Sequence, residues 1–271
     1  MALPILKWAG GKRALLPELL ARIPERVGTY YEPFAGGASL FFKLSDAPPF
    51  RRAVLGDRNA ELVNLYAVVR DQVAELVDAL AEYKLGEQAY YEAREQDPAE
   101  LDDVRRAARV LYLNRTCFNG LWRVNRAGKF NVPYGKYPRP KVLDLPRLTK
   151  ASAALANTKL VNDDFARVLS RAKAGDFVYL DPPYAPVSAT SKFTDYAHGG
   201  FGSNEQARLA AYARTLSARG VKVLLSNSDT PEIRALYKGF KISVVQAPRA
   251  ISARAAGRGA VNELLIEGKH K

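Results

Sequence analysis

The sequence predicts an α/β fold, in which a largely parallel sheet is interrupted by a helical insert that ends in a basic β-hairpin. Four short apolar runs, each closed by Gly, Asp, Pro or Asn, indicate buried parallel strands within residues 28–37, 52–59, 176–184 and 221–229. Residues 61–118, in contrast, carry apolar side chains at three- and four-residue spacing, which is typical of helices. This alternation of strand and helix patterns predicts the fold class.

The composition excludes several classes of protein and favours a polyanionic partner. Lysine and arginine number 41 against 28 acidic residues, a formal net charge of +13, which favours nucleic acid as a partner. No run of about 18 apolar residues is present, and the N-terminal sequence does not resemble a signal peptide, so we expect neither a membrane span nor secretion. Cys117 is the single cysteine and only two histidines are present, which leaves little for a disulfide, a zinc site or a histidine triad.

The first motif, LKWAGGKR at residues 6–13, has a superficial likeness to a phosphate-binding loop. The lysine of such a loop precedes Ser or Thr, whereas Arg13 follows Lys12 here, so a nucleoside triphosphate does not fit. Two glycines beside two lysines and Trp8 could instead line a crevice for an adenosyl ligand, with one lysine left for DNA.

The second motif, FAGGAS, follows the first predicted strand, and Ser39 is placed to open a helix. Glycines let the backbone approach a ligand closely, and a helix N-terminus adds a favourable dipole. Asp57 closes the next strand about 20 residues after Gly36, the separation at which an acidic side chain binds ribose hydroxyls. G-x-G-x-x-G is absent, so a dinucleotide is not favoured, and a tight strand–helix turn is the alternative.

Residues 58–144 form the expected insert, and residues 1–57 and 145–271 form the expected sheet domain. A β-hairpin is predicted over residues 121–132, with its turn at residues 125–129. Basic side chains interleave with aromatic ones here, which suits a surface that grips phosphates and inserts into a duplex, although about half of the aromatics are expected in the core. These residues are Arg115, Arg123, Arg126, Lys129, Lys136, Arg139 and Lys141, with Phe118, Trp122, Phe130, Tyr134 and Tyr137.

The sequence Asp-Pro-Pro-Tyr at residues 181–184 closes the third predicted strand. Its prolines fix φ and remove two N–H donors, which leaves the Asp181 carboxylate and the Pro182 carbonyl as a rigid row of acceptors. The exocyclic amino group of a base can donate both hydrogens to that row while the Tyr184 ring stacks on the base. Such bonds localise the nitrogen lone pair toward an electrophilic methyl group. A plain strand with a proline turn is the alternative.

The C-terminal part predicts one more helix and two more strands. The helix is expected between an N-cap at Asn204 and a C-cap at Gly220. Residues 241–252 and 261–270 predict strands joined by a Gly/Arg-rich turn. The polar stretch 185–205 is expected to be mobile without DNA and to close over a bound base.

The ordered motifs resemble those of the DNA adenine-N6 methyltransferases, in the Dam-type branch that places the glycine-rich motif before the recognition insert and DPPY after it. The matching pieces cover most of the chain: LKWAGGK, EPFAGGAS, LGDRN, LYLNR, FNGLWRVN, GKFNVPYG, DPPYAPVSAT and NELL. The resemblance implies a Rossmann-like sheet that uses S-adenosylmethionine to methylate N6 of adenine in duplex DNA, above all in GATC. It also implies that the target base is flipped into a DPPY pocket.

The resemblance also implies a role for each matching residue. S-adenosylmethionine is expected against Trp8, Ala9, Lys12, Phe34, Ala35, Gly36, Asp57, Phe165 and Asp181. The flipped adenine is expected against Asp181, Pro182, Pro183 and Tyr184. DNA contacts are expected from Lys7, Arg94, Arg115, Phe118, Asn119, Leu121, Arg123, Pro133 and Tyr137.

Several of these DNA contacts carry a more specific expectation. Lys7 and Arg123 correspond to readers of guanines in the outer pairs of GATC, and Leu121 and Pro133 to contacts with an inner pair. Phe118 and Asn119 correspond to the pair that intercalates and fills the gap left by the flipped base. Phe118 stands where many relatives have tyrosine, which keeps the stacking and loses a hydroxyl.

Three alternatives stay open from the sequence. The acceptor row also suits the amino group of cytosine, and it does not distinguish DNA from RNA. A DNA-binding protein that has lost catalysis is the third, although the intact Asp57 and Asp181 argue against it. We expect duplex DNA as the partner, with or without a cognate restriction endonuclease, a cytoplasmic location, and neither a metal nor a membrane.

Overall fold

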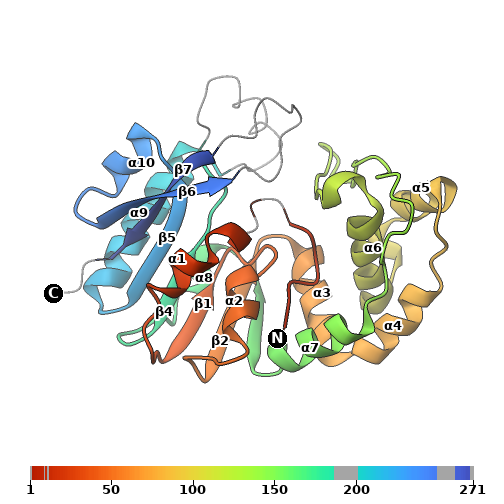
Figure 1. Cartoon of the computed structure of the whole chain (residues 1–271), viewed down its shortest axis with the longest axis horizontal. Coiled ribbons are helices and arrows are strands. Elements are labelled where there is room, and N and C mark those ends of the chain that lie inside the picture. Colours follow the sequence, from red (N-terminus) through yellow and green to blue (C-terminus); the bar gives the residue numbers. More distant parts are fainter. Residues whose placement is uncertain (1, 9, 11, 186–200, 249–259, 269–271) are drawn as a thin grey trace. The chain divides into compact units, whose positions relative to one another are not determined.

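The computed structural model describes residues 2–8, 10, 12–185, 201–248 and 260–268, and the chain divides into two compact units (Figure 1). Unit 1 consists of Met1–Gly11, Gly36–Pro48 and Asp57–Asn162. Unit 2 consists of Lys12–Ala35, Pro49–Gly56 and Asp163–Lys271. The expected boundaries of the insert, at residues 58 and 144, stay a prediction.

The described strands form a mixed sheet in the order β3-β2-β1-β4-β5-β7-β6, which confirms the predicted fold class. β1 pairs in parallel with β2 and β4, and β4 pairs in parallel with β5. The four predicted buried strands are all present, as β1 (Thr29–Glu32), β2 (Arg52–Asp57), β4 (Phe177–Leu180) and β5 (Lys222–Ser228).

Two predicted C-terminal strands complete one side of the sheet, and one strand was not predicted. β6 (Lys241–Pro248) and β7 (Ala260–Glu267) pair antiparallel with each other, and β7 pairs antiparallel with β5. The unpredicted strand is β3 (Thr158–Asn162), in which polar Thr, Lys and Asn surround only two apolar residues. The expected Gly/Arg-rich turn at 249–259 and residues 186–200 of the expected mobile stretch lie outside the described residues.

The described part of unit 2 contains five short or long helices, of which the three that follow residue 164 contribute to a continuous apolar core. They are η1 (Lys12–Ala14), α1 (Leu16–Leu20), α8 (Phe165–Val168), α9 (Ser203–Ala218) and α10 (Pro231–Leu236). Figure 1 shows α9 beside β5, and Leu209, Leu216 and Leu225 of these two elements are fully buried. A buried leucine contributes about 1.5–3 kcal/mol, so the apolar faces of these elements hold them together.

The two ends of α9 were predicted with different success. The expected N-cap at Asn204 is wrong, because the helix begins at Ser203 and Gly202 is its cap. The Gly202 carbonyl accepts the first helical hydrogen bond from Gln206 N, which makes Gly202 the last extended residue. At the other end, Gly220 adopts φ +81° directly after the helix, as a C-terminal glycine should.

Where it is described, unit 1 has helices within the stretch that the sequence predicts as helical, residues 61–118, and also one helix before it and one after it. They are α2 (Ser39–Leu44), α3 (Ala60–Asp71), α4 (Val73–Ala81), α5 (Glu87–Glu95), α6 (Asp103–Thr116) and α7 (Leu145–Leu155), with short turns η2 (Pro98–Glu100) and η3 (Phe118–Gly120). Asn59 and Asp102 cap α3 and α6 through their side chains. Figure 1 shows α3, α4, α6 and α7 side by side, in agreement with their mutual contacts.

The predicted hairpin is present, although its pairing is too short to form regular strands. Val124 and Phe130 form an isolated antiparallel bridge, and a second bridge joins Cys117 to Tyr134. The turn is closed by Asn125, whose side chain accepts from Ala127 N and Lys129 N at 2.9 and 3.0 Å. Local Asx geometry therefore holds the turn where the ladder is short.

Candidate active site and DNA-recognition surface

Asp181 follows β4 in unit 2, and two side chains hold its carboxylate. The Lys12 ammonium lies 2.9 Å from Asp181 Oδ1, and Ser226 Oγ of β5 donates to the same oxygen at 2.8 Å. Lys12 is 8% exposed and the Asp181 side chain is 19% exposed. Because the pair lies this deep, removal of either side chain would leave a buried charge without its partner.

Two opposing effects set the protonation of Asp181. Burial raises the pKa of the Asp181 carboxyl above its ordinary value, while the charge and hydrogen bond of Lys12 and the hydrogen bond of Ser226 lower it. Lys12 and Ser226, which oppose the effect of burial on this pKa, therefore favour the carboxylate form of Asp181, which can accept hydrogen bonds.

The ring of Tyr184 lies beside the same pair. The Lys12 ammonium lies 4.4 Å from the centre of this ring, and Tyr184 OH donates to Glu263 Oε2 of β7 at 2.7 Å. Burial, followed by the charges of Asp181 and Glu263, raises the pKa of Tyr184 well above its ordinary value. The phenol is therefore neutral, and it is anchored at its hydroxyl end while its ring face meets a cation.

A buried amide network holds the backbone that follows Asp181. Gln206 Nε2 donates to the Pro183 carbonyl at 2.8 Å, and Asn227 Nδ2 donates to Gln206 Oε1 at 3.0 Å. Ala185 N donates to Asn227 Oδ1 at 3.4 Å. Gln206 and Asn227 are at most 1% exposed, so this network holds the loop from the protein interior. It uses the Pro183 carbonyl as an acceptor and not the Pro182 carbonyl.

These supporting residues were missed in the sequence. Ser226 and Asn227 lie within a predicted strand, Gln206 lies within a predicted helix, and Glu263 belongs to the NELL motif without an assigned role. The one available signal was the polar end of an otherwise apolar strand, Ser226-Asn227-Ser228, since polar groups buried at a strand end need partners.

A second cluster of unit 2 contains aromatic rings. The Phe34 ring centre lies 5.7 Å from that of Phe165 and 5.4 Å from that of Phe201. Phe165 is 2% exposed, whereas Phe34 is half-buried. The Arg208 guanidinium lies 4.1 Å from the Phe165 ring centre and pairs with Asp164 at 3.0 and 2.5 Å. Phe165 therefore supports Phe34, which keeps more of its own ring available.

In unit 1, the two motif glycines lie under the indole of Trp8. Gly36 has φ +46°, and a Cβ placed there would lie 2.8 Å from Trp8 Cδ1. A Cβ on Gly37 would lie 3.1 Å from Trp8 Cβ. These glycines therefore allow the Trp8 side chain of the first motif to pack closely on the backbone of the second motif. This contact explains why the two motifs occur together.

Asp57 is held by backbone groups of the same unit. Its Oδ2 accepts from Gly36 N at 3.0 Å and its Oδ1 accepts from Asn59 N at 2.9 Å. Burial raises the pKa of the Asp57 carboxyl, and the backbone hydrogen bonds from Asn59, Gly36 and Arg58 oppose that shift. A carboxylate offers about four acceptor positions, so hydroxyl groups of a ligand can still bind.

Lys7 belongs to a rigid junction of unit 1. Lys7 N donates to Asn114 Oδ1 at 2.9 Å, and Asn114 Nδ2 donates back to Lys7 O at 2.7 Å. The same nitrogen donates to Gly120 O at 3.0 Å. Asn114 therefore fixes the backbone of Lys7, whose ammonium lies 4.7 Å from the Tyr137 ring centre.

Phe118 and Asn119 form an exposed corner at the end of α6. Phe118 is 49% exposed, and Asn119 adopts the left-handed φ of +56°. Phe118 N donates to Pro133 O at 2.9 Å, and Asn119 N donates to Tyr137 OH at 2.8 Å. An exposed aromatic on a fixed backbone costs little ordering entropy when it enters a stack of bases.

The three arginines expected at DNA differ in their surroundings. Arg123 is exposed, and its guanidinium donates to Asn131 Oδ1 at 2.7 Å and to Asn131 O at 3.2 Å. Arg115 is half-buried and donates to Ile5 O at 2.5 Å, and burial lowers the pKa of its guanidinium. Arg94 pairs with Glu95 and lies over the Tyr91 ring.

The structure groups some of the expected residues within each unit. Lys12, Asp181 and Tyr184 form one cluster of unit 2, and Phe34 and Phe165 form another. Leu121 is half-buried and Pro133 is exposed in unit 1, and Ala9 lies outside the described residues. In the part of the chain that the structure describes, no group of three or more His, Cys, Asp or Glu could hold a metal ion.

Comparison with known proteins shows the family to which this chain belongs. The model of the family described as D12 class N6 adenine-specific DNA methyltransferase matches residues 8–251. The Type II methyltransferase M1.LlaDCHI of Lactococcus lactis subsp. cremoris is 41% identical, over 97% of this chain and 94% of the relative. The Type II methyltransferase M.MjaIII of Methanocaldococcus jannaschii is 38% identical, over 97% and 98%. The DNA adenine methylase of Escherichia coli strain K12 is 39% identical, over 96% and 93%.

Proposed function

This chain belongs to the D12 class N6 adenine-specific DNA methyltransferases, and we propose that it methylates adenine N6 within GATC in duplex DNA after flipping that base out of the helix. The observation that supports this most is the geometry at Asp181, whose carboxyl group at the end of β4 is held by the side chains of Lys12 and Ser226. Relatives named as DNA adenine methylases support the choice of adenine over cytosine and of DNA over RNA.

We propose that Asp181 and Pro182 act together on the amino group. The Asp181 carboxylate accepts one amino hydrogen and the Pro182 carbonyl accepts the other, while the Gln206 bond to Pro183 keeps the loop rigid. As the N–C bond forms and the methyl group's bond to sulfur breaks, with S-adenosylhomocysteine as the leaving group, the nitrogen becomes positive. The adjacent carboxylate stabilises that charge until one amino proton passes to solvent water. Tyr184 and Pro183 border the base, and Glu263 keeps the Tyr184 ring in one orientation.

The residues present fit S-adenosylmethionine, which supplies an electrophilic methyl group when it is bound. We propose that Asp57 accepts hydrogen bonds from ribose hydroxyls, since two of its acceptor positions are used by backbone N–H groups and about two remain. Phe34 contacts the adenine ring, with Phe165 as its support. The full proposed set is Trp8, Ala9, Lys12, Phe34, Ala35, Gly36, Asp57, Phe165 and Asp181.

The DNA contacts that we propose are those that the family resemblance implies, and side-chain exposure and a fixed backbone in unit 1 support some of them. The exposed Phe118 and the adjoining Asn119 fill the gap left by the flipped base, whose extrusion costs a few kcal/mol. Lys7 and Arg123 read outer guanines, Leu121 and Pro133 contact an inner pair, and Tyr137 orients Lys7 and Asn119. Arg115 and Arg94 are half-buried and engaged by Ile5 O and Glu95, so for these two we propose phosphate contacts only. Arg123 is exposed, and we propose that it exchanges its bonds to Asn131 for a base.

Methylation of plasmid DNA by the purified chain tests this proposal. We expect the treated plasmid to resist a nuclease that GATC methylation blocks and to be cut by one that requires it. Tritiated cofactor should label N6 of adenine in a GATC duplex, and not an RNA oligomer of the same sequence. Label in N4 of cytosine, or equal label in RNA, would replace the proposal by one of the alternatives.

Two variants test the proposed reading of an outer pair. Arg123→Ala should reduce the preference for the outer G·C pair by about 1–3 kcal/mol, because a bidentate contact to guanine is lost. Lys141→Ala is the matched control, since Lys141 is an exposed cation of the same region that pairs with Asp144 at 3.1 Å. It should weaken methylation of all sequences alike, and equal losses of specificity in both variants contradict the assignment.

A further inference from the structure

The edge of the unit 2 sheet where the parallel strands begin carries cations that the proposed function does not use. Val27 N donates to Pro49 O at 2.9 Å, Gly28 N donates to Gly175 O at 2.9 Å, and Gly175 N donates to Gly220 O at 3.2 Å. The loops that precede β2, β1, β4 and β5 are therefore neighbours. Their cations form what we call the basic rim: Arg26, Arg51, Arg52, Arg171, Lys173, Arg219 and Lys222.

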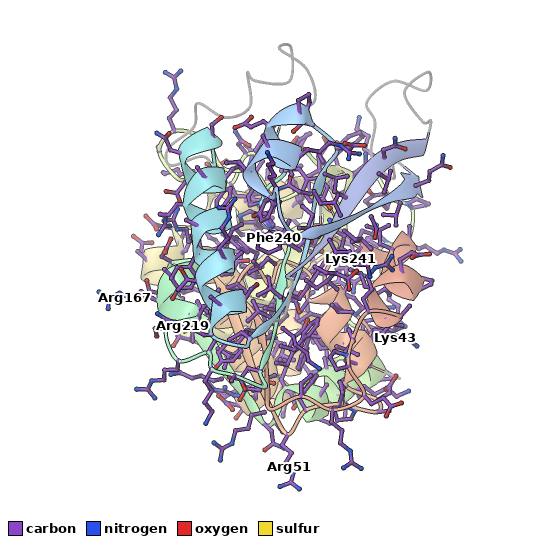
Figure 2. The ribbon with its side chains drawn as sticks, turned by 90° about the vertical axis from the view of Figure 1, so that its left-hand side faces the viewer. Lys43, Arg51, Arg167, Arg219, Phe240 and Lys241 are labelled. Carbon is purple, nitrogen blue, oxygen red and sulfur yellow. The ribbon has the colours of Figure 1, made fainter. Side chains whose placement is uncertain are left out.

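The side chains of the basic rim are turned to solvent. Six are exposed and Lys222 is half-buried, and none makes an ion pair or a side-chain hydrogen bond with another residue that the structure describes. Figure 2 shows Arg51 extending outward from the lower end of the ribbon. Elsewhere in unit 2, Arg22, Arg208 and Arg234 are paired with carboxylates, whereas the seven cations of the rim pair with none that the structure describes.

Acidic groups near the rim leave its charge uncompensated. Glu25 is the one exposed acid within residues 24–28, 49–52, 170–176 and 218–222. Asp176 is 2% exposed, and it accepts from Thr29 N at 2.8 Å and Lys173 N at 3.0 Å. Glu267, the next acid along the sheet, is engaged by Arg22 and Lys241. The rim therefore attracts polyanions.

The rim lies at the opposite edge of the sheet from Asp181. The four residues of β4 separate Asp176 from Asp181, a distance of about 16 Å at roughly 3.3 Å per residue. β1 and β5 run in the same direction as β4. A duplex that presents a base to Asp181 thus leaves the rim free for another ligand.

We propose that the basic rim binds the phosphate backbone of a second segment of duplex DNA, independently of its sequence. Three strand spacings of about 4.8 Å separate β2 from β5, so the rim spans about 14 Å. This length corresponds to about four base pairs at 3.4 Å each, enough for several phosphates on each strand. Arginine dominates the rim, and its planar fork suits phosphate oxygens.

One molecule then holds two duplexes at once, one for chemistry and one through the basic rim. The rim contacts carry no sequence information, because they reach only phosphates. They keep the enzyme on DNA while the segment at the active site is exchanged.

Two short duplexes with different dyes test this inference with the full-length chain. One duplex contains GATC and carries a donor dye, and the other lacks GATC and carries an acceptor dye. The rim variant combines Arg26→Gln, Arg51→Gln, Arg171→Gln and Arg219→Gln. The control variant removes four exposed charges away from the rim, through Arg214→Gln, Arg234→Gln and Lys238→Gln in unit 2 and Lys84→Gln in unit 1.

We expect energy transfer and a two-duplex complex in sedimentation for the wild type and the control, and neither for the rim variant. The salt dependence of second-duplex binding should become less steep by about 3 to 4 log units per log unit of salt, at about 0.9 for each lost phosphate contact. Single-turnover methylation of the short GATC duplex should stay within twofold.

Several results would overturn the inference. One is that the wild-type protein binds a single duplex even at low salt. Another is that the control variant loses the second duplex as fully as the rim variant does. A third is that the rim prefers anionic vesicles to the second duplex. Loss of methylation in the rim variant would place the rim within the first DNA site. Failure of GATC methylation alone leaves the binding measurement intact, so the two proposals fail separately.

Discussion

Asp57 and Asp181 each close a buried strand, and the protein holds them in different ways. Backbone N–H groups of Gly36 and Asn59 bind Asp57, whereas side chains of Lys12 and Ser226 bind Asp181. A backbone donor stays in place when a ligand arrives, but a side chain can rotate away. Asp57 is therefore a fixed acceptor, and Asp181 is an acceptor whose partners can be exchanged for an amino group.

The pKa shifts repeat this difference. Burial raises the pKa of both carboxyls, but backbone bonds oppose the shift at Asp57 while a cation opposes it at Asp181. The protonation of Asp181 therefore depends on side chains that substitution can remove. Four variants test the comparison, in order of decreasing expected effect.

Removal of the exchangeable acceptor should have the largest effect. Asp181→Ala should lower kcat by about 10³-fold or more, because it removes an electrostatic contact made to charge that develops during the reaction. Duplex binding should stay within a few fold, as measured by fluorescence anisotropy. A loss of binding that parallels the loss of turnover contradicts the role assigned to Asp181.

Alteration of the fixed acceptor should affect stability and cofactor binding together. Asp57→Asn turns an amide NH₂ toward one of the two backbone donors, which should lower the free energy of unfolding by about 1–3 kcal/mol. Calorimetry should show weaker S-adenosylmethionine binding. Unchanged unfolding in urea would mean that the backbone bonds to Asp57 do not hold the loop.

Ser226→Ala should shift the pH dependence of turnover. Turnover needs the ionised carboxylate, so it falls as pH falls through the pKa of Asp181. The Ser226 bond lowers that pKa, and its loss should move the acid limb of the kcat profile to higher pH. Asn227, its neighbour at the end of the same strand, serves as a control, because Asn227→Ser leaves both donors to Asp181 in place.

The contribution of Asp181 to the free energy of unfolding should change with pH in the opposite sense to turnover. Because the pKa of Asp181 is raised on folding, its contribution to stability is fully present below the unfolded value of about 3.9 and is lost as pH rises through the folded value. Circular dichroism over the pH range where turnover first declines distinguishes titration of Asp181, which leaves the protein folded, from acid unfolding. Unfolding in that range would assign the acid limb to the fold as a whole.

The smallest effect is expected for Tyr66, whose hydroxyl group binds the backbone of Gly36. Tyr66 OH donates to Gly36 O at 2.6 Å, and Tyr66→Phe should cost about 1 kcal/mol of stability with kcat unchanged. Gly36→Ala is the stronger partner variant, because it combines φ +46° with a contact of 2.8 Å to Trp8. Equal effects of the two changes would contradict the packing of Trp8 on Gly36.

Particular residues show why the sequence predicted only part of the site. DPPY, Gly36 and Asp57 carry local signals, since each occupies a turn or a strand end that few residue types can fill. Gln206, Asn227 and Glu263 act through partners 23, 21 and 79 residues away, and no local pattern marks them. Arg115 shows the reverse case, because its charge indicated DNA while the fold turns it toward Ile5 O.

The sequence by itself determined the α/β class, the order of its motifs and the chemistry available at Asp181, because apolar periodicity and turn residues act over a few positions. Tertiary structure alone decided which donors hold each aspartate and which cations stay unpaired. Those outcomes depend on loops that adjoin only after the parallel strands pair, as in the bonds from Gly28 to Gly175 and from Gly175 to Gly220. The basic rim exists for the same reason, since its seven cations come from four loops and the first residues of two strands, which are distant in the chain.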